Sequence, residues 1–222
     1  MRALQWEFPH DPNLVGADRQ FLLGPALLIT PVLNEGATTV DGIFPGEAPW
    51  CDWYTQTVVP DSWHNTNTTI NAPLGHIPIH VRGGHVIPLQ EPANTTAESR
   101  KNSWQVLVAL DEAGLATGSL YLDDGESQSP NQTQTVAFTA RESQLTAEVN
   151  GKYKMGDITT RLATATIMGV QCFNGTVTFN GKKLDSVDYD ANRKLLQVQG
   201  LQSMTPHGAW EEGWVISWTG KC

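Results

Sequence analysis

The densest group of acidic side chains is the segment Asp123-Asp124-Gly125-Glu126. A Ca²⁺ loop needs oxygen ligands at alternate positions, as in D-x-[DN]-x-[DN]-G, and this spacing is absent here. A pair of catalytic carboxyl groups has to converge from different elements, whereas neighbouring residues of one hairpin point apart. The segment therefore predicts an acidic β-turn rather than a catalytic or metal site.

Three histidines lie close together in the sequence: His76, His80 and His85. His76 and His80 fall on the same face of a predicted strand, about 13 Å apart, which is four strand steps. They cannot share a metal ion that is ligated at about 2 Å. We expect histidines that are hydrogen-bonded or that lie on the polar face of the strand.

Two other kinds of catalytic motif are also missing. Arg82-Gly83-Gly84-His85 is too short for a phosphate-binding loop and opens no helix. Three serines lack the G-x-S-x-G setting of a nucleophile, namely Ser62, Ser99 and Ser103. We therefore assign no catalytic residue to this chain.

Trp50, Trp53 and Tyr54 form an aromatic cluster with two interpretations. Their flat faces can stack on sugar rings, because one face of a pyranose is apolar. They can equally fill the core or a corner of a β unit. We favour the core.

Four Asn-x-Ser/Thr acceptors indicate N-glycosylation in the secretory pathway, at Asn67, Asn94, Asn131 and Asn174. About two are expected by chance in a chain of this composition, so unused sequons stay an alternative. The chain opens on an apolar run of strand type, residues 1–8, with no charged leader before it. We expect a secreted, extracellular protein that was cut from a longer precursor.

The cysteines Cys51, Cys172 and Cys222 are odd in number and form no C-x-x-C motif, so they do not make a zinc site. Cys172 and Cys222 are candidates for a disulfide that would tie down the C-terminus. The three alternative pairings cannot be distinguished from the sequence.

The elements that would position these residues are mainly strands. Short runs rich in Val, Ile, Thr and aromatic residues recur between Gly, Pro, Asn and Asp, at residues 26–32, 77–81, 85–89, 105–110, 119–122, 135–140, 144–149, 164–170, 176–179, 194–198 and 215–218. Asn150-Gly151 and Asn180-Gly181 predict hairpin turns. Residues 18–24 are the best candidate for a short helix, which Asp18 would cap and Gly24-Pro25 would stop.

Composition excludes several classes of function. The 222 residues carry a net charge of -9 and no basic run, so nucleic acid would be repelled. No apolar stretch approaches about 18 residues, so we expect no membrane span. We expect neither a metal nor a cofactor. What remains is an acidic β protein of two units, separated by the polar stretch at residues 91–103.

Several motifs also occur in a fixed order along the first 130 residues. They are Asp18-Arg19-Gln20-Phe21-Leu22-Leu23-Gly24-Pro25, Trp50-Cys51-Asp52-Trp53-Tyr54-Thr55, His76-Ile77-Pro78-Ile79-His80-Val81-Arg82-Gly83-Gly84 and Gly118-Ser119-Leu120-Tyr121-Leu122-Asp123-Asp124-Gly125-Glu126. This series resembles glycoside hydrolase family 31, in its α-glucosidase branch of secreted fungal type. The sequence departs from the family pattern at Trp6, usually Phe or Leu, at Cys51, usually Tyr, and at Gly75, often Asp.

The resemblance implies a fold class and a division into domains. Residues 1–25 would be the last strand and closing helix of a catalytic (β/α)8 barrel. Residues 26–100 would form a proximal, and residues 101–222 a distal, antiparallel β-sandwich domain. The family's catalytic carboxyl groups lie on earlier barrel strands, so none of them maps onto this chain.

The resemblance also implies a function for the whole assembly. Terminal α-linked glucose would be released from maltose-type oligosaccharides with retention, or transferred to another sugar, by two carboxyl groups about 5–5.5 Å apart. Both would belong to an obligate partner, the N-terminal catalytic subunit of the same precursor, and a higher oligomer stays open. The alternative is a carbohydrate-binding or structural β-sandwich module that is made as its own protein.

Overall fold

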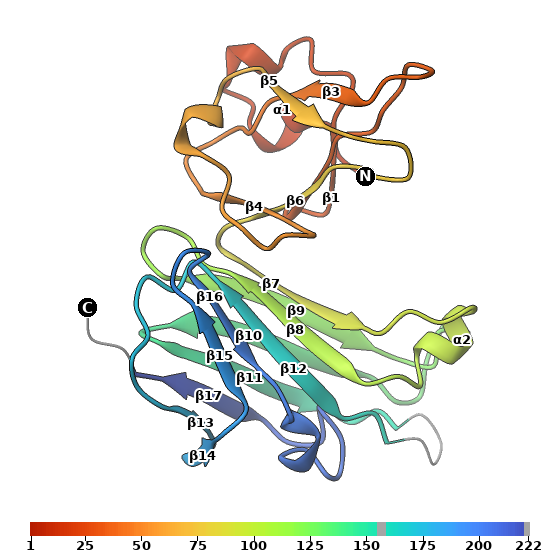
Figure 1. Ribbon diagram of the computed structural model, residues 1–222. Helices are drawn as coiled ribbons and strands as arrows, with labels where there is room; N and C mark the ends of the chain where they lie inside the picture. The colour runs from red at the N-terminus through yellow and green to blue at the C-terminus, as the bar shows by residue number, and fades with distance from the viewer. Residues whose placement is uncertain (155–158, 220–222) are drawn as a thin grey trace. The chain divides into compact units, whose positions relative to one another are not determined.

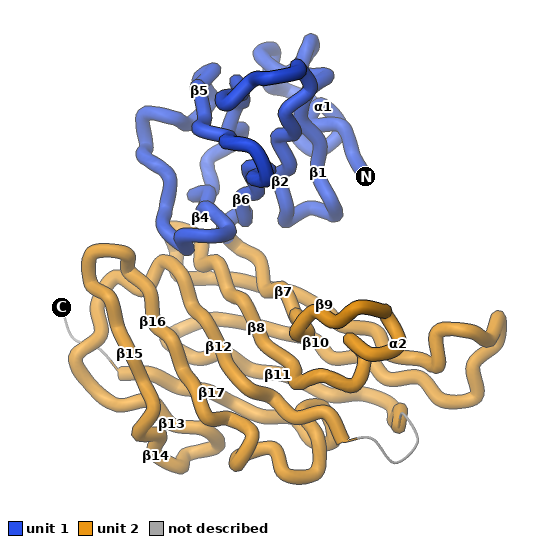
Figure 2. Tube along the Cα trace, turned by 45° about the vertical axis from the view of Figure 1, so that its right-hand side comes forward, with its two compact units in different colours: residues 1–83 blue, residues 84–222 orange. Residues whose placement is uncertain are grey.

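The computed structural model describes residues 1–154 and 159–219. The chain divides into two compact units, Met1–Gly83 and Gly84–Cys222 (Figure 2). As the sequence predicts, the regular elements of the described residues are mainly strands, and their α-helices are two single turns, α1 (Leu4–Glu7) and α2 (Thr96–Ser99). The expected boundaries at residues 25 and 100 do not coincide with this division. Residues 1–25 share a core with the rest of unit 1, and the strand that follows Gly84 pairs within unit 2.

Unit 1 contains two small antiparallel sheets (Figure 1). In the first, the order β1-β2-β6-β4 joins Phe21–Leu23, Leu27–Ile29, Ile79–Arg82 and Trp50–Asp52. In the second, β3 (Thr39–Gly42) pairs with β5 (Thr68–Asn71). Single 3-10 turns occur at Pro12–Leu14 and Asp61–Trp63.

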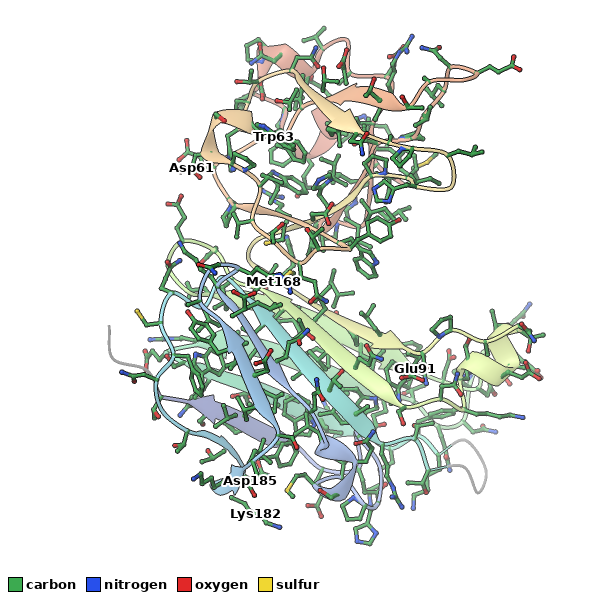
Figure 3. The ribbon with its side chains drawn as sticks, in the orientation of Figure 1. Asp61, Trp63, Glu91, Met168, Lys182 and Asp185 are labelled. Atoms are coloured by element: carbon green, nitrogen blue, oxygen red, sulfur yellow. The ribbon has the colours of Figure 1, made fainter. Side chains whose placement is uncertain are left out.

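The core of unit 1 is small and holds two large aromatic side chains, Phe44 and Trp50, both fully buried. Trp63, labelled in Figure 3, stacks on Phe44 with ring centroids 5.6 Å apart. The indole of Trp50 donates to the carbonyl of Pro45, which satisfies its only polar atom. Trp50 is thus a core residue, as we favoured, but the prediction is wrong for Tyr54, which is 50% exposed, and Trp53 is only half-buried.

The opening segment is not the strand that the sequence predicts. Leu4–Glu7 form the helical turn α1, which ends at Phe8 because the following Pro9 disfavours a helical conformation there. One bridge ties the segment to β1: the amides of Arg2 and Leu22 each donate to the other's carbonyl. Leu4 is buried in the core, so the segment is packed into unit 1.

The helix expected at residues 18–24 is also absent, because Phe21–Leu23 form β1 instead. Gly24 has a positive φ of 63°, which suits the tight connection between β1 and β2. The pair Gly24-Pro25 therefore turns a hairpin where we expected it to stop a helix. β1 pairs with β2, with Phe21 opposite Ile29 at one end and Leu23 opposite Leu27 at the other.

Unit 2 is built on one continuous sheet of eleven strands (Figure 1), in the order β14-β13-β17-β11-β10-β9-β7-β8-β12-β16-β15. Their bounds in chain order are β7 (His85–Gln90), β8 (Trp104–Ala109), β9 (Ala116–Leu122), β10 (Gln134–Arg141), β11 (Gln144–Gly151), β12 (Leu162–Met168), β13 (Val177–Phe179), β14 (Lys182–Leu184), β15 (Val187–Asp190), β16 (Leu195–Val198) and β17 (Trp214–Trp218). A 3-10 turn, Leu201–Ser203, follows β16.

Alternation of buried and exposed residues places the core on one face of this sheet. In β10, Val136, Phe138 and Ala140 are buried while the residues between them are exposed. Side chains from the two halves of the sheet belong to the same buried cluster, for example Ile167 of β12 and Ile216 of β17. The sheet therefore folds over a shared core.

The pairing is not purely antiparallel, which corrects the expected architecture. β8 and β12 are parallel neighbours, with Val106 opposite Ala165. A parallel pair needs a long crossover connection, and here β9, β10 and β11 lie between the two strands in the sequence. The prediction followed hairpin signals, which report only antiparallel neighbours.

One of the two predicted hairpin turns is confirmed. Asn180 and Gly181 have φ values of 48° and 79° and connect β13 to β14, as a type I′ turn requires. Asn150-Gly151 is not a turn, because Gly151 pairs with Gln134 at the end of the β10–β11 ladder. That hairpin turns at Glu142 and Ser143, which have φ values of 51° and 59°.

Candidate functional site

The acidic segment after β9 is a turn held by its own hydrogen bonds. Asp124 Oδ2 accepts from the Ser127 hydroxyl at 2.6 Å, and its Oδ1 accepts from the amides of Ser127 and Glu126. These bonds lower the pKa of Asp124 to about 2. The guanidinium of Arg100 donates to the carbonyls of Asp123 and Asp124. The carboxylate oxygens of Asp124 thus serve the turn, in agreement with the prediction.

The histidines of unit 1 do not converge on a common ligand. Across residues 1–154 and 159–219, no group of three His, Cys, Asp or Glu side chains could hold a metal ion. His76 lies against the ring of exposed Tyr54, with ring centroids 4.4 Å apart. His80 is buried with its ring edge against Phe44. The two thus lie in different surroundings.

Burial dominates the chemistry of His80, whose side chain is only 2% exposed. Burial lowers the pKa of His80 to about 4, although Asp52, whose Oδ2 lies 3.8 Å from Nε2, acts in the opposite direction. His80 is therefore neutral at pH 7, and its Nδ1 is buried without a hydrogen-bond partner. Next to it in the sheet, Cys51 is free and buried, and burial raises the pKa of its thiol to about 12. Neither group is suited to acid–base or nucleophilic work at neutral pH.

The predicted modification sites lie on the surface. All four sequon asparagines are exposed, at Asn67, Asn94, Asn131 and Asn174. Asn94 precedes Thr95, which caps α2 by accepting from the amide of Glu98. Their glycosylation stays a prediction. The predicted Cys172–Cys222 pair also stays a prediction, because Cys222 lies outside the described residues.

Two hollows lie in unit 2, at one end of its sheet. A cleft of about 320 Å³ opens where β7 ends at Gln90, β8 begins at Trp104 and β10 begins at Gln134. Trp210, from the loop before β17, also lines it. A second hollow of about 430 Å³ adjoins the first, since both are lined by His207, Gly208 and Glu211.

No sequence signal pointed to this cleft. The two glutamines are 44 positions apart in the chain. They line the same cleft because β7 runs parallel to β9, so that Gln90 lies at the same end of the sheet as Leu122, which pairs with Gln134. Neither residue belongs to a motif with fixed spacing. Among the described residues that line the cleft, Glu211 alone is acidic, so these residues supply no pair of catalytic carboxyl groups.

Unit 1 presents an unusual number of exposed apolar side chains. Seven aliphatic or tryptophan residues of this smaller unit are exposed, namely Met1, Trp6, Val15, Leu23, Leu33, Leu74 and Ile77. Among the described residues of unit 2, the exposed large hydrophobic residues are Leu115 and Tyr121. The exposed apolar side chains of unit 1 are available for contact with another polypeptide.

Comparison with known proteins gives the family. The family model for the glycosyl hydrolase family 31 C-terminal domain matches residues 1–87. An α-glucosidase of Aspergillus niger is 48% identical over 223 residues, which cover 98% of this chain and 22% of that protein. The chain belongs to glycoside hydrolase family 31.

A further family 31 relative gives the same extent of match. An α-glucosidase of Schizosaccharomyces pombe is 44% identical over 219 residues, again covering 98% of this chain and 22% of that protein. The chain therefore spans about a fifth of the length of these curated relatives.

The fold agrees with a solved structure. The glucosidase II alpha subunit matches 98% of this chain with a TM-score of 0.77 and 23% sequence identity, over 25% of its own length. At this identity the likeness concerns the fold alone. It extends through both compact units, beyond the residues that the family model covers.

Proposed function

We propose that this chain is the C-terminal part of a secreted α-glucosidase whose catalytic carboxyl groups lie in the preceding part of the same precursor. The observation that carries the proposal is the 48% identity to an α-glucosidase over almost the whole chain. The chain's small share of its relatives' length supports the division of labour. The absence of two converging carboxyl groups among the described residues of the sites above also supports it.

The proposed reaction removes terminal α-linked glucose from maltose-type oligosaccharides with retention. One carboxylate would attack the anomeric carbon and form a glycosyl-enzyme, while a carboxylic acid protonates the departing oxygen. The same acid, now a base, would activate water, or a sugar hydroxyl when glucose is transferred. Both carboxyl groups would come from the catalytic barrel. Residues 1–25 would lie at the junction between that barrel and the rest of this chain.

The chain's own role is then to support that barrel. The exposed apolar residues of unit 1, among them Trp6 and Leu74, would pack against the barrel and lose their contact with water on assembly. Such a surface favours an obligate pair of chains, made as one polypeptide, over an independent carbohydrate-binding or structural module.

The test uses the natural protein. Intact mass and N-terminal sequencing would reveal a companion fragment of barrel size, and maltose would be hydrolysed by the assembled chains. After separation in denaturant and refolding, we expect this chain alone to be inactive. Hydrolysis of maltose by the isolated chain would contradict the division of labour. A stably folded, monomeric chain without a companion would favour the independent module.

A further inference from the structure

The cleft of unit 2 contains two carboxamides held in fixed orientations. The side-chain nitrogen of Gln134 donates to the carbonyl of Trp210 at 2.7 Å. That of Gln90 donates to the carbonyls of Arg100 and Asn102, at 3.2 and 3.1 Å. A carbonyl only accepts hydrogen bonds, so each contact places the NH₂ group on that side and the Oε1 atom on the other.

These Oε1 atoms are acceptors without a donor. Neither receives a hydrogen bond within the described part of the chain, and neither is among the buried atoms that lack a partner. Both are therefore reached by solvent, although Gln134 as a whole is only 5% exposed. The cleft that Gln90 and Gln134 line therefore offers two preset acceptors for a ligand's O–H or N–H groups.

Hydroxyl groups line the same cleft. Thr160 Oγ1 accepts from the indole of Trp104 at 3.1 Å, and the Tyr153 oxygen accepts from Arg100 at 3.3 Å. Because each oxygen acts as an acceptor in these contacts, its own O–H remains able to donate. Acceptors and donors thus line the same cleft, together with Trp104 and Trp210.

The charges in the cleft argue against an anionic ligand. The guanidinium of Arg100 is engaged by the carbonyls of Asp123 and Asp124. The ammonium of Lys154 lies 3.8 Å from the carboxylate of Glu211. The charged oxygens of an anion would also bring no hydrogen for the two Oε1 acceptors. A neutral ligand rich in hydroxyl groups satisfies them.

We propose that unit 2 binds a neutral sugar in this cleft, through Gln90 and Gln134 as acceptors and Tyr153 and Thr160 as donors. The volume of about 320 Å³ falls in the range of small-molecule pockets. The choice of an α-glucan as the ligand rests on the proposed function; the hydroxyl-binding chemistry does not. The site gives this unit a binding role besides its structural one.

The experiment uses the whole protein that contains this chain. Its ligands are β-cyclodextrin, a closed ring of α-linked glucose with no end to hydrolyse, and D-glucose. Binding is measured by calorimetry for the wild type, Gln90→Leu and Gln134→Leu. The matched control is Gln171→Leu, which makes the same change at an exposed glutamine outside the cleft, whose amide also donates to a carbonyl, that of Gly169.

We expect Gln90→Leu and Gln134→Leu each to weaken sugar binding about tenfold or more, and Gln171→Leu to leave it unchanged. Thermal unfolding identifies any variant that fails to fold. If Gln134→Leu fails to fold, Gln90→Leu still tests the proposal, because Gln90 is only half-buried. Binding of neither sugar, equal binding by Gln90→Leu and the wild type, or binding of gluconate in place of the sugars would overturn the proposal. Maltose hydrolysis is assayed in parallel, and its absence would count against the proposed function alone.

Discussion

At the scale of single residues, His80 is the group whose chemistry depends most clearly on folding. Its pKa is lowered to about 4 from an ordinary 6.5, chiefly because burial disfavours the imidazolium. Asp52 opposes the shift and His76 adds to it. The unfolded chain therefore binds more protons than the folded chain between these two values.

This difference predicts that unit 1 loses stability in mild acid. A lowered histidine pKa means that the stabilising contribution is fully present above about pH 6.5 and is lost as the pH falls toward 4. The loss would reach on the order of 3 kcal/mol, the equivalent of the shift between the two pKa values. We expect the thermal midpoint of the wild type to fall in this window more steeply than that of His80→Gln.

The control for this prediction is the exposed His10. His10→Gln should follow the wild-type pH profile, because an exposed imidazole is solvated in both states. Parallel pH profiles for the wild type and His80→Gln would show that His80 does not bind its proton more weakly in the folded state.

At the scale of elements, the β10–β11 hairpin has an unfavourable turn sequence. Glu142 and Ser143 both have positive φ values, which cost non-glycine residues roughly 1–2 kcal/mol each in the left-handed region. Asn-Gly is the preferred pair for such a turn. The double substitution Glu142→Asn, Ser143→Gly should therefore stabilise unit 2 by about 1 kcal/mol or more, measured by urea unfolding.

A second hairpin supplies the reciprocal control. Asn180-Gly181 already has the preferred sequence at the β13–β14 turn. Replacing Gly181 by Ala should destabilise the protein, since φ there is 79°. If the double substitution at Glu142 and Ser143 lowers stability instead, the turn geometry assigned to this hairpin is wrong.

The strands that could be predicted are those long enough for an alternating pattern of apolar and polar side chains. β10 alternates over eight residues and was expected at nearly its observed length. β1 and β4 have three residues each, too few for a period-2 pattern to emerge. α1 was mistaken for a strand because Leu4, Trp6 and Phe8 alternate, yet only Leu4 of these is buried.

The pairing of strands that are distant in the sequence could not be predicted from local sequence patterns. The turn at Glu142-Ser143 has no Gly or Asn, and the ladder on either side imposes its conformation. The cleft depends on the ends of β7 and β10 lying on either side of β9, which no spacing in the sequence encodes. Motif spacing along the chain, in contrast, was enough to predict that the segment at Asp123-Asp124 forms an acidic turn.

At the scale of the whole molecule, the exposed apolar residues of unit 1 distinguish the proposed subunit from an independent module. If the unit packs on a catalytic barrel, Trp6, which is 75% exposed in this chain alone, becomes buried in the whole protein. Hydroxyl-radical labelling should then modify Trp6 and Leu74 slowly in the intact protein. Tyr121 of unit 2, 56% exposed, should react as in the denatured protein.

Substitution at the same surface tests its energetic role. Burying one large apolar side chain contributes about 1.5–3 kcal/mol, so Trp6→Ser should weaken association of the separated chains by roughly 10- to 100-fold. Tyr121→Ser, the corresponding change at an exposed aromatic residue of unit 2, should leave the association unchanged. Rapid labelling of Trp6 in the intact protein, together with normal association of Trp6→Ser, would mean that this face meets solvent in the mature enzyme and that unit 1 is held by other contacts.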